Sequence, residues 1–283
     1  MKKILVTGVG GQLGFDVVKL LNKNNDYKVL GVDVADFSLT DKKATQDFIF
    51  NFAPDIVIHS AAYTAVDKAE SEQELCFSVN ELGTKYIAEA CKQINATMVY
   101  ISTDYVYSGA GEKIYEVDEK TAPLGVYGKS KLAGELAASN TVDKLYIIRT
   151  SWVFGLNGNN FVKTMLRLGS ERDSLSVVSD QIGSPTYTPD LAEFIEFLIK
   201  TDKFGTYHFS NEGFCSWYDF AKEIFNQSNI SINLTPIATA DYKTAAVRPL
   251  NSRLSKQKNY DVGYKKIPSW QDALTRYLKE INL

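Results

Sequence analysis

The sequence is poor in the residues that build disulfide frameworks and metal sites. Its 283 residues include three cysteines and two histidines. The cysteines are odd in number, lie far apart and form no C-x-x-C pair, which argues against a disulfide framework or a zinc site. Each histidine lies in an apolar run typical of a strand, which indicates packing rather than metal binding. We therefore expect no metal site. The residues concerned are Cys76, Cys91, Cys215, His59 and His208.

Long apolar runs and a large excess of charge of one sign are also absent. The formal net charge is -3, and lysine and arginine do not occur in runs longer than two. This composition argues against a nucleic acid or an anionic membrane as partner. No apolar stretch approaches the ~20 residues of a membrane span. The apolar run near the start ends at Thr7, too early for a signal peptide. We expect a cytoplasmic protein.

Apolar runs of strand length alternate with helical patterns in the first half of the sequence. The runs with strand character are Lys3–Thr7, Lys28–Val32, Ile56–Ser60, Thr97–Ser102 and Leu145–Thr150. The segments with helical spacing are Gln12–Asn22, Asp41–Phe52, Glu72–Gln93 and Tyr127–Ser139. Such alternation predicts β-α-β units and therefore a parallel sheet with helices on both faces. The predicted fold class is α/β, a doubly wound parallel sheet of the Rossmann-like type.

The second half of the sequence has a less regular pattern. Loops rich in glycine and asparagine interrupt shorter elements there. Helix starts remain visible at Thr188, which stands before a proline, and at Ser269, three residues before an aspartate. We predict a dinucleotide-binding domain in residues 1–150. Residues 151–283 are predicted to form a smaller, irregular C-terminal lobe that binds substrate, with some segments returning to the main sheet.

A glycine-rich turn follows the first predicted strand. Gly8, Gly11 and Gly14 fit the pattern G-x-x-G-x-x-G, whereas G-x-G-x-x-G fails because position 13 is leucine. Glycines at these positions permit a tight turn and let backbone N–H groups approach a pyrophosphate at the start of a helix. Asp33 stands nineteen residues beyond Gly14, at the end of the second strand. A carboxylate there suits the ribose hydroxyls of a dinucleotide.

The same region predicts which dinucleotide is used. Asp33 would repel the 2′-phosphate of NADPH. The four residues after it, 34–37, include no lysine or arginine that would neutralise this phosphate. We therefore predict NADH or NADPH as the cofactor, with NADH preferred.

A threonine, a tyrosine and a lysine complete a pattern for carbonyl reduction. Thr103 follows the fourth predicted strand and can hydrogen-bond the substrate oxygen. Tyr127 and Lys131 are four residues apart on a predicted helix, so their side chains share one face. Reduction by hydride also requires a proton, and a nearby ammonium group lowers the pKa of a phenol towards neutral pH. Lys129 is the less suitable partner because it points to another face.

With these residues the sequence resembles the extended short-chain dehydrogenase/reductases and, within them, the dTDP-4-dehydrorhamnose reductases. The similar blocks cover nearly the whole chain. The most specific are Ala-Val-Asp-Lys-Ala-Glu at 65–70 and Asp-Gln-Ile-Gly-Ser-Pro-Thr at 180–186. Two departures are His59-Ser60, where members often carry Asn-Ala, and Tyr107, where phenylalanine is usual. Neither departure touches the residues of proton transfer.

The resemblance implies the last step of dTDP-L-rhamnose synthesis, the reduction of dTDP-4-dehydro-β-L-rhamnose at C4. It implies Tyr127 as the proton donor, Lys131 as the partner that tunes its pKa, and Thr103 as an oxygen-binding hydroxyl. Arg248 would bind the diphosphate, because a guanidinium fork matches phosphate oxygens; the alternative is that it braces a loop. The implied substrate contacts are Thr103, Asp104, Trp152 and Arg248. The implied cofactor contacts are Gly8, Gly11, Gln12, Leu13, Gly14, Asp33, Ser38, Leu39, Ser60, Ala61, Ala62, Tyr127 and Lys131.

Two other functions fit part of the pattern. A nucleotide-sugar epimerase or dehydratase would retain NAD through each turnover, and a dehydratase would need an acidic pair where the sequence has Asp104 and Tyr105. A non-catalytic regulatory subunit, like that of methionine adenosyltransferase, would not need an intact threonine, tyrosine and lysine. We therefore expect an NAD(P)H-dependent reductase with a nucleotide-sugar substrate. It would be a monomer or a homodimer, and the sequence identifies no acidic cluster for a metal at a dimer interface.

Overall fold

The core of the fold is a six-stranded parallel sheet. Its strands are β1 (Lys2–Thr7), β2 (Tyr27–Val32), β3 (Ile56–His59), β4 (Thr97–Thr103), β5 (Leu145–Thr150) and β10 (Gly205–Phe209). They lie in the order β10-β5-β4-β3-β1-β2, and every neighbouring pair is parallel. The computed structural model describes residues 1–281, so the last two residues of the predicted C-terminal lobe, 282 and 283, lie outside the described part. The predicted doubly wound α/β fold is confirmed.

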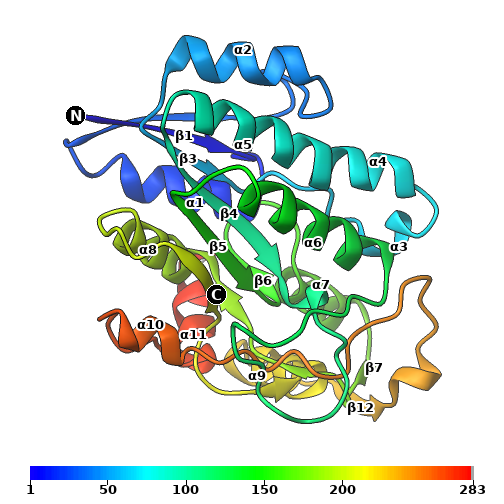
Figure 1. Ribbon diagram of the computed structural model, residues 1–283. Helices are drawn as coiled ribbons and strands as arrows, with labels where there is room; N and C mark the ends of the chain where they lie inside the picture. Colours follow the sequence, from blue (N-terminus) through cyan, green and yellow to red (C-terminus); the bar gives the residue numbers. More distant parts are fainter. Residues whose placement is uncertain (282–283) are drawn as a thin grey trace.

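Helices cover both faces of the sheet (Figure 1), because its strands carry apolar side chains on both sides. One face holds α1 (Gln12–Leu21) and α8 (Thr188–Leu198), and the other holds α2 (Lys42–Phe52), α5 (Thr84–Gln93) and α6 (Val126–Ser139). Ile4 and Val6 of β1 pack with α1 and α8, whereas Leu5 packs with α2 and α5 on the opposite face. Among the described helices, none is long and apolar enough to cross a membrane.

The strand order creates a crevice at one edge of the sheet. The chain runs from β1 outward to β2, then crosses to β3 on the other side of β1 and continues through β4 to β5. The loops that leave β1 and β3 therefore diverge, and ligands of such sheets bind at the carboxyl ends of the strands at this reversal. Gly8 follows β1, Ser60 follows β3, and Thr103 ends β4. Residues predicted for cofactor binding and catalysis thus meet at one edge.

The predicted helical segment Glu72–Gln93 is interrupted in the structure. It consists of α4 (Gln73–Phe77), a π-helical turn η1 (Ser78–Gly83) and α5. At the π turn, the Asn80 side-chain nitrogen donates to Ser130 Oγ on α6 at 2.9 Å and to the Tyr63 carbonyl at 3.1 Å. Single π turns occur mostly inside α-helices and frequently lie at functional sites. They leave no mark in the spacing of apolar residues, so the sequence indicated one continuous helix.

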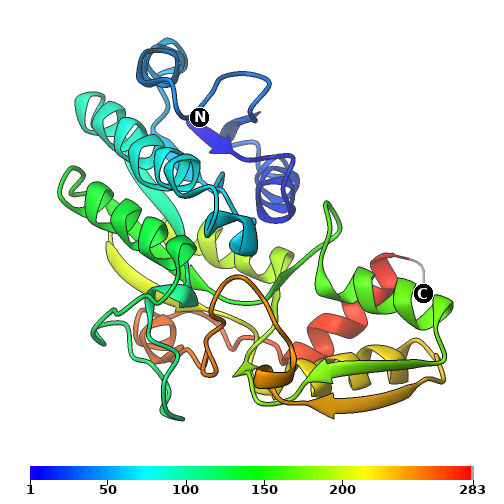
Figure 2. The same cartoon turned by 90° about the vertical axis from the view of Figure 1, so that its right-hand side faces the viewer.

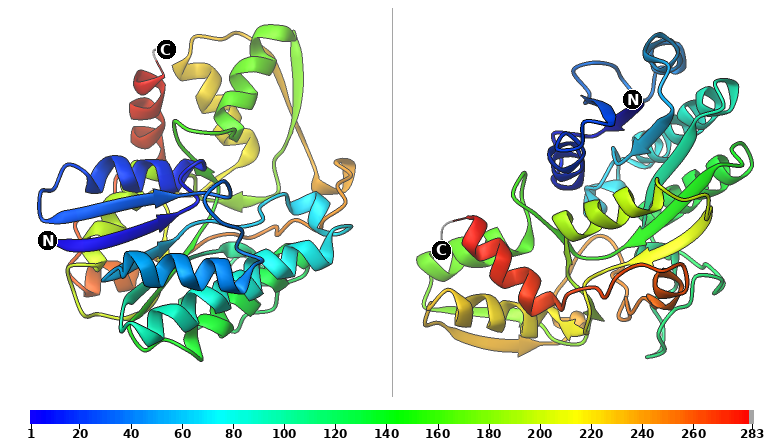
Figure 3. Two further views of the ribbon diagram at one scale, coloured as in Figure 1. Left: turned by 90° about the horizontal axis from the view of Figure 1, so that it is seen from above. Right: turned by 90° about the vertical axis from the view of Figure 1, so that its left-hand side faces the viewer.

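Most of the second half gathers beside the carboxyl edge of the sheet, as Figures 2 and 3 show. It has its own apolar core, which includes Phe154, Val162, Phe220 and Leu274. β10 and α8 come from this half and join the main sheet and its cover, but the division at residue 150 stays a prediction. The larger elements are α7 (Phe161–Glu171), β7 (Ser174–Val178), α9 (Trp217–Gln227), β12 (Asn233–Ile237) and α11 (Trp270–Glu280). The remaining short elements of the chain are α3 (Val66–Ala69), η2 (Asp104–Val106), β6 (Val153–Phe154), β8 (Ile182–Gly183), β9 (Thr186–Tyr187), β11 (Cys215–Ser216), η3 (Thr239–Asp241) and α10 (Gln257–Asp261).

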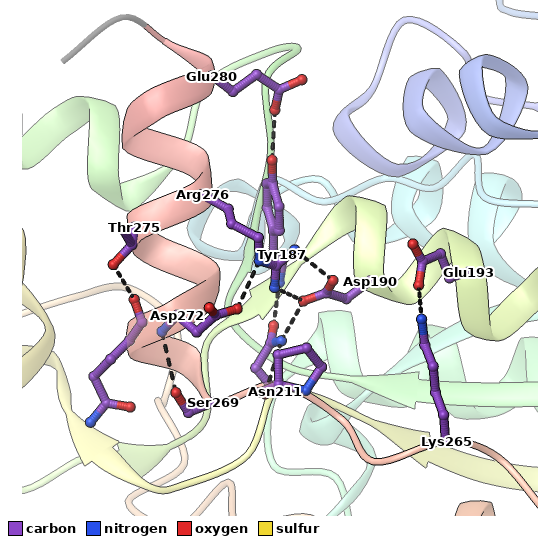
Figure 4. A network of polar contacts seen from close by, with 12 residues as sticks. Tyr187, Asp190, Glu193, Asn211, Lys265, Ser269, Asp272, Thr275, Arg276 and Glu280 are labelled. Carbon is purple, nitrogen blue, oxygen red and sulfur yellow. Dashed lines mark hydrogen bonds and ion pairs between the residues drawn. The ribbon is translucent and has the colours of Figure 1, made fainter.

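A polar network ties α11 to α8 (Figure 4). Arg276 of α11 donates to both carboxylate oxygens of Asp190 on α8, at 2.8 and 2.7 Å. Asn211 donates to the same carboxylate at 2.6 Å, and its side-chain oxygen accepts the Tyr187 N–H at 2.8 Å. Asp190 is buried, so a bidentate guanidinium partner satisfies a charge that would otherwise be costly to bury.

The two helix starts predicted in the second half differ in outcome. Ser269 caps α11 as predicted, because its side-chain oxygen accepts the Asp272 N–H. The predicted cap at Thr188 is wrong. Thr188 is the first residue of α8, and its hydroxyl donates to the Asp16 carboxylate of α1 at 2.5 Å. The Asp16 carboxylate is far from Thr188 in the sequence, so the local pattern of a threonine before a proline could not reveal this contact.

Candidate active site

A cavity of about 820 Å³ lies at the carboxyl edge of the sheet. Its walls are the glycine turn after β1, the ends of β3 and β4, and the start of α6. The structure thus brings the three predicted catalytic residues together with most of the predicted cofactor residues. We call this space the catalytic cavity. The predicted residues in its lining are Gly8, Gly11, Gln12, Leu13, Gly14, Asp33, Ser60, Ala61, Ala62, Thr103, Asp104, Tyr127, Lys131 and Trp152.

The glycine turn has the geometry that a bound pyrophosphate requires. Gly8 has a φ of +74°, and a side chain there would come within 2.7 Å of the Ala61 backbone. A side chain at Gly14 would collide with the Gly8 carbonyl. Gly11 is the N-cap of α1 and offers no side-chain acceptor to the first N–H groups of that helix. These groups remain available to phosphate oxygens, so the turn fits a dinucleotide.

Asp33 holds the glycine turn as well as lining the cavity. Its Oδ2 accepts the Gly10 N–H at 2.6 Å, and its Oδ1 accepts the Val34 N–H at 2.7 Å. A neighbouring pocket of about 170 Å³ shares Asp33 with the catalytic cavity and contains the other two predicted cofactor residues, Ser38 and Leu39. None of the described residues that line this pocket is lysine or arginine. The absence of lysine and arginine from residues 34–37 thus extends to the described lining of this pocket, and the cofactor preference stays a prediction.

Thr103 and Asp104 form a buried pair at the end of β4. The Thr103 hydroxyl donates to Asp104 Oδ1 at 3.0 Å, and the Ser252 hydroxyl donates to Asp104 Oδ2 at 2.5 Å. Burial raises the pKa of the Asp104 carboxyl to about 6, although both hydroxyl groups act against this rise. Asp104 is therefore an acceptor placed next to Thr103 and held from both sides.

Tyr127 and Lys131 lie on α6 and face the same cavity, as their spacing predicted. Lys131 is buried, with its Nζ 4.1 Å from the centre of the Tyr100 ring, whereas Lys129 is exposed. Burial lowers the pKa of Lys131 to about 7. Burial also raises the pKa of Tyr127 above its ordinary value, and the Thr103 hydroxyl acts in the opposite direction. The predicted lowering of the Tyr127 pKa by Lys131 is not seen in this geometry, because Lys131 is not among the groups that shift it and burial is the largest cause.

A second cavity of about 680 Å³ adjoins the first and shares Tyr105, Trp152 and Trp217 with it. Trp152 stacks on Trp217 with ring centres 3.7 Å apart. The other walls come from α7, β7 and the segment after β12, which turns back from the lobe towards the sheet (Figure 2). We call this space the lobe cavity. It contains Arg248 but none of the three residues predicted to act in catalysis.

Arg248 is already engaged with its neighbours. Its guanidinium forms an ion pair with Asp67 of α3 and donates to the Tyr105 hydroxyl at 3.2 Å. Asp67 also accepts the Ala246 N–H at 3.1 Å. Arg248 therefore braces the segment after β12 and also lines the lobe cavity, so both roles considered from the sequence are compatible with its position. Its role towards a diphosphate stays a prediction.

Comparison with known proteins identifies the family. The whole chain, residues 1–283, matches the family model described as the RmlD substrate binding domain. The chain belongs to this family. It is 44% identical over 287 residues to the dTDP-4-dehydrorhamnose reductase of Aggregatibacter actinomycetemcomitans, with 97% of each chain covered. The resemblance indicated by the sequence motifs is confirmed.

Two further relatives of this RmlD-family chain agree. It is 41% identical over 280 residues to the spore coat polysaccharide biosynthesis protein SpsK of Bacillus subtilis, covering 99% of this chain and 98% of that one. A crystal structure of dTDP-4-dehydrorhamnose reductase from Bacillus anthracis in complex with NADP matches it with a TM-score of 0.96 and 42% identity. That match covers 99% of both chains.

Four residues of the site in this RmlD-family chain were missed in the sequence. Tyr105 packs edge-on against Tyr127 with ring centres 5.4 Å apart, and Ser252 holds Asp104. Asn157 donates to the Gly10 carbonyl at 2.8 Å, so the loop after β6 contacts the glycine turn. Trp217 supplies the stacking partner of Trp152. Tyr105 and Ser252 lie in two further blocks that resemble the family, 102–106 and 248–252, and so carried a signal. Asn157 and Trp217 depend on tertiary contacts that local spacing does not encode.

Proposed function

We propose that the protein reduces the C4 ketone of dTDP-4-dehydro-β-L-rhamnose to give dTDP-L-rhamnose. The observation that carries this proposal is the convergence of the glycine turn, Thr103, Tyr127 and Lys131 on one cavity. A dinucleotide held by the turn and a ketone held by the threonine would then be in contact. The names of the relatives support the choice of substrate.

Three side chains donate the proton, bind the ketone oxygen and stabilise the charge that develops in the reaction. When bound, a reduced nicotinamide supplies hydride to C4. The high pKa of Tyr127 keeps its phenol protonated at neutral pH, which is the form needed to donate a proton to the developing C4 oxyanion. Thr103 would turn its hydroxyl from Asp104 and donate a second hydrogen bond to that oxygen. The Lys131 ammonium stabilises the tyrosinate left behind, because an opposite charge nearby favours the ionised phenol.

The two cavities suggest how the substrate lies. The sugar would occupy the junction between them, where Trp152 offers an aromatic face and Asp104 offers an acceptor for a sugar hydroxyl. The nucleotide would extend into the lobe cavity. Arg248 would there exchange its ion pair with Asp67 for the diphosphate, which offers more acceptors in a geometry that suits a guanidinium.

For the cofactor we infer that NADH is used at least as well as NADPH. Asp33 lies where the adenosine ribose would bind, and the pocket beside it has no basic lining residue among those described. The relative from Bacillus anthracis binds NADP in its crystal structure, so NADPH is included as a substrate rather than excluded. Repulsion between Asp33 and a 2′-phosphate supports the preference.

The test is turnover with defined sugar nucleotides. Purified protein is mixed with NADH and with enzymatically generated dTDP-4-dehydro-β-L-rhamnose, and loss of NADH absorbance is followed while the sugar product is identified by NMR. The proposal predicts reduction at C4 with the configuration of L-rhamnose. UDP- and GDP-linked 4-keto-sugars serve as comparison substrates. Reduction of one of these and not of the dTDP-linked sugar would contradict the proposed substrate.

A further inference from the structure

A buried ion pair lies one helical turn beyond the catalytic lysine. Glu135 is four residues after Lys131 on α6, and both are buried. Its carboxylate accepts two hydrogen bonds from Arg149 of β5, at 2.9 and 2.6 Å. The Ser102 hydroxyl of β4 donates to the same carboxylate at 2.5 Å. Glu135 therefore joins α6, which carries Tyr127 and Lys131, to the strand that ends in Thr103.

The pair continues into a chain of buried groups. Arg149 donates to the Tyr107 hydroxyl at 2.6 Å and to the Val117 carbonyl at 3.1 Å. The Tyr107 oxygen and His208 Nε2 lie 2.7 Å apart. These contacts hold Arg149 on the side of Glu135 that faces away from α6, towards β10 and the 107–117 segment. In the ion pair, the negative Glu135 therefore lies nearer to α6 and the positive Arg149 lies farther from it.

Most groups around Lys131 are neutral. On β3, burial lowers the pKa of His59 to about 3. On α4, β4 and α6, burial raises the pKa values of Cys76, Tyr100 and Tyr127. All four groups are therefore uncharged near pH 7. They help to bury Lys131 and do not balance its charge.

Three charged groups remain to be considered. Asp104 of η2 acts on Tyr127 and is held by Thr103 and Ser252. Arg149 of β5 pairs with Glu135 and is not among the groups that shift the pKa of Lys131. The carboxylate that favours the charged form of Lys131 is that of Glu135.

We propose that Glu135 is a positioning residue for the reduction. Glu135 keeps Lys131 in its ammonium form and holds α6 in register with β4. This inference rests on the proposed function, because it assigns a purpose to the charge on Lys131. If the pair were needed only for stability, apolar side chains could take its place, because buried ion pairs can often be replaced by apolar residues without loss of stability. The two roles of the pair can therefore be separated by experiment.

The first variant is Glu135→Gln, which keeps the shape and an acceptor for Ser102 but removes the charge. We measure kcat/KM for NADH against pH, with the 4-keto-sugar saturating, because this ratio reports groups in the form of the enzyme that binds NADH. In the wild type we expect it to fall as pH rises through about 7, because burial lowers the pKa of Lys131 to about 7. In the variant this alkaline limb should move to lower pH by about one unit or more, because a nearby opposite charge has been removed.

The second variant separates the loss of the Glu135 charge from a loss of stability. This control is needed because Glu135→Gln leaves the Arg149 charge buried without its partner. Glu135→Leu combined with Arg149→Met removes both charges and keeps apolar volume. We expect its thermal unfolding to be close to that of the wild type, while its alkaline limb stays at the lower pH. Recovery of the wild-type limb in this double variant would overturn the proposal and leave the pair a structural role only.

The ion pair between Asp190, which is buried, and Arg276, which is half-buried, supplies a control (Figure 4), because neither residue lines the catalytic cavity. Asp190→Leu with Arg276→Met should leave the pH profile in place. A shift equal to that of the Glu135 variants would mean that loss of an ion pair outside the cavity also perturbs the site, and would contradict the proposal.

A second readout does not depend on turnover. Lys131 is also a predicted cofactor contact, so the Kd for NADH, measured by fluorescence, should weaken with rising pH along the same limb. Glu135→Gln should move this midpoint down with the kinetic one. If the wild type binds NADH but reduces no 4-keto-sugar, the proposed function fails while the binding midpoints still decide the role of Glu135. If the midpoints of wild type and variant coincide, the role of Glu135 fails on its own.

Discussion

The catalytic cavity and the lobe cavity adjoin each other but are built differently. The walls of the first are the ends of parallel strands and the start of α6, and its polar side chains are fixed by buried hydrogen bonds such as those on Asp104. The walls of the second come from α7, β7 and the segment after β12, and include mainly apolar groups such as Leu168 and Val177. One of its lining residues, Tyr242, is 56% exposed.

This difference indicates that the sheet and the lobe have different functions. Proton transfer depends on atoms held within hydrogen-bond distance, which the ends of buried strands provide. Recognition of a nucleotide depends more on area and on one or two charged contacts, which an irregular lobe provides. Changes at the sheet should therefore affect kcat strongly, and changes at the lobe should affect KM.

The largest effect is expected at the sheet. Tyr127→Phe should lower kcat by about 10²–10⁴-fold while NADH still binds, because it removes the general acid and keeps the ring. Stopped-flow measurement of NADH oxidation and fluorescence titration of NADH check the two parts. Tyr146→Phe is the control, since its hydroxyl donates to Thr201 at 2.6 Å and lies outside both cavities. Wild-type turnover in Tyr127→Phe would remove the mechanism proposed here.

A smaller effect is expected at the lobe. Arg248→Ala should raise the KM for the sugar nucleotide by about 10- to 100-fold with little change in kcat, because hydrogen bonds to charged groups contribute about 1.5–3 kcal/mol. Arg253→Ala is the control, because Arg253 contacts Asn251 and lines neither cavity. Steady-state kinetics with varied sugar nucleotide decide the matter. A KM that stays the same in Arg248→Ala would leave this residue only its bracing role with Asp67.

The smallest effect concerns the choice of cofactor. The ratio of kcat/KM values should favour NADH or be near one, and Asp33→Asn should shift it towards NADPH by about fivefold. Like charges a few ångströms apart in water repel by about 1 kcal/mol, and asparagine keeps an oxygen for the Gly10 N–H. The ratio is measured at one ionic strength for both proteins. A tenfold preference of the wild type for NADPH would contradict the argument from Asp33.

The sequence predicted more about the sheet than about the lobe, for physical reasons. Buried parallel strands need continuous apolar runs, so β1 and β5 were visible within a residue of their observed bounds. The glycine turn and the spacing of Tyr127 and Lys131 depend on residues close together in the sequence, so both could be identified without the structure. The contact between Trp152 and Trp217, by contrast, joins two distant loops of the chain. Such contacts depend on how the whole chain packs.

The pKa of Tyr127 shows a second limit of sequence reasoning. The four-residue spacing correctly put an ammonium group on the same face of α6. The pKa of the phenol nevertheless depends on burial by neighbours such as Tyr105 and Tyr100, which the spacing does not reveal. The residues were identifiable from the sequence, but their protonation required the structure.

The most direct test of the central proposal is the balance between cofactor and product. Protein stripped of nucleotide by dialysis is given excess 4-keto-sugar nucleotide and a measured amount of NADH, and both NAD⁺ and the reduced sugar are quantified. A reductase that binds and releases its cofactor in every cycle should form one reduced sugar for each NADH consumed, with no product when NADH is left out. Sugar converted without consumption of added NADH, together with NAD⁺ that survives dialysis in a one-to-one ratio with protein, would contradict a reductase and identify an epimerase or dehydratase.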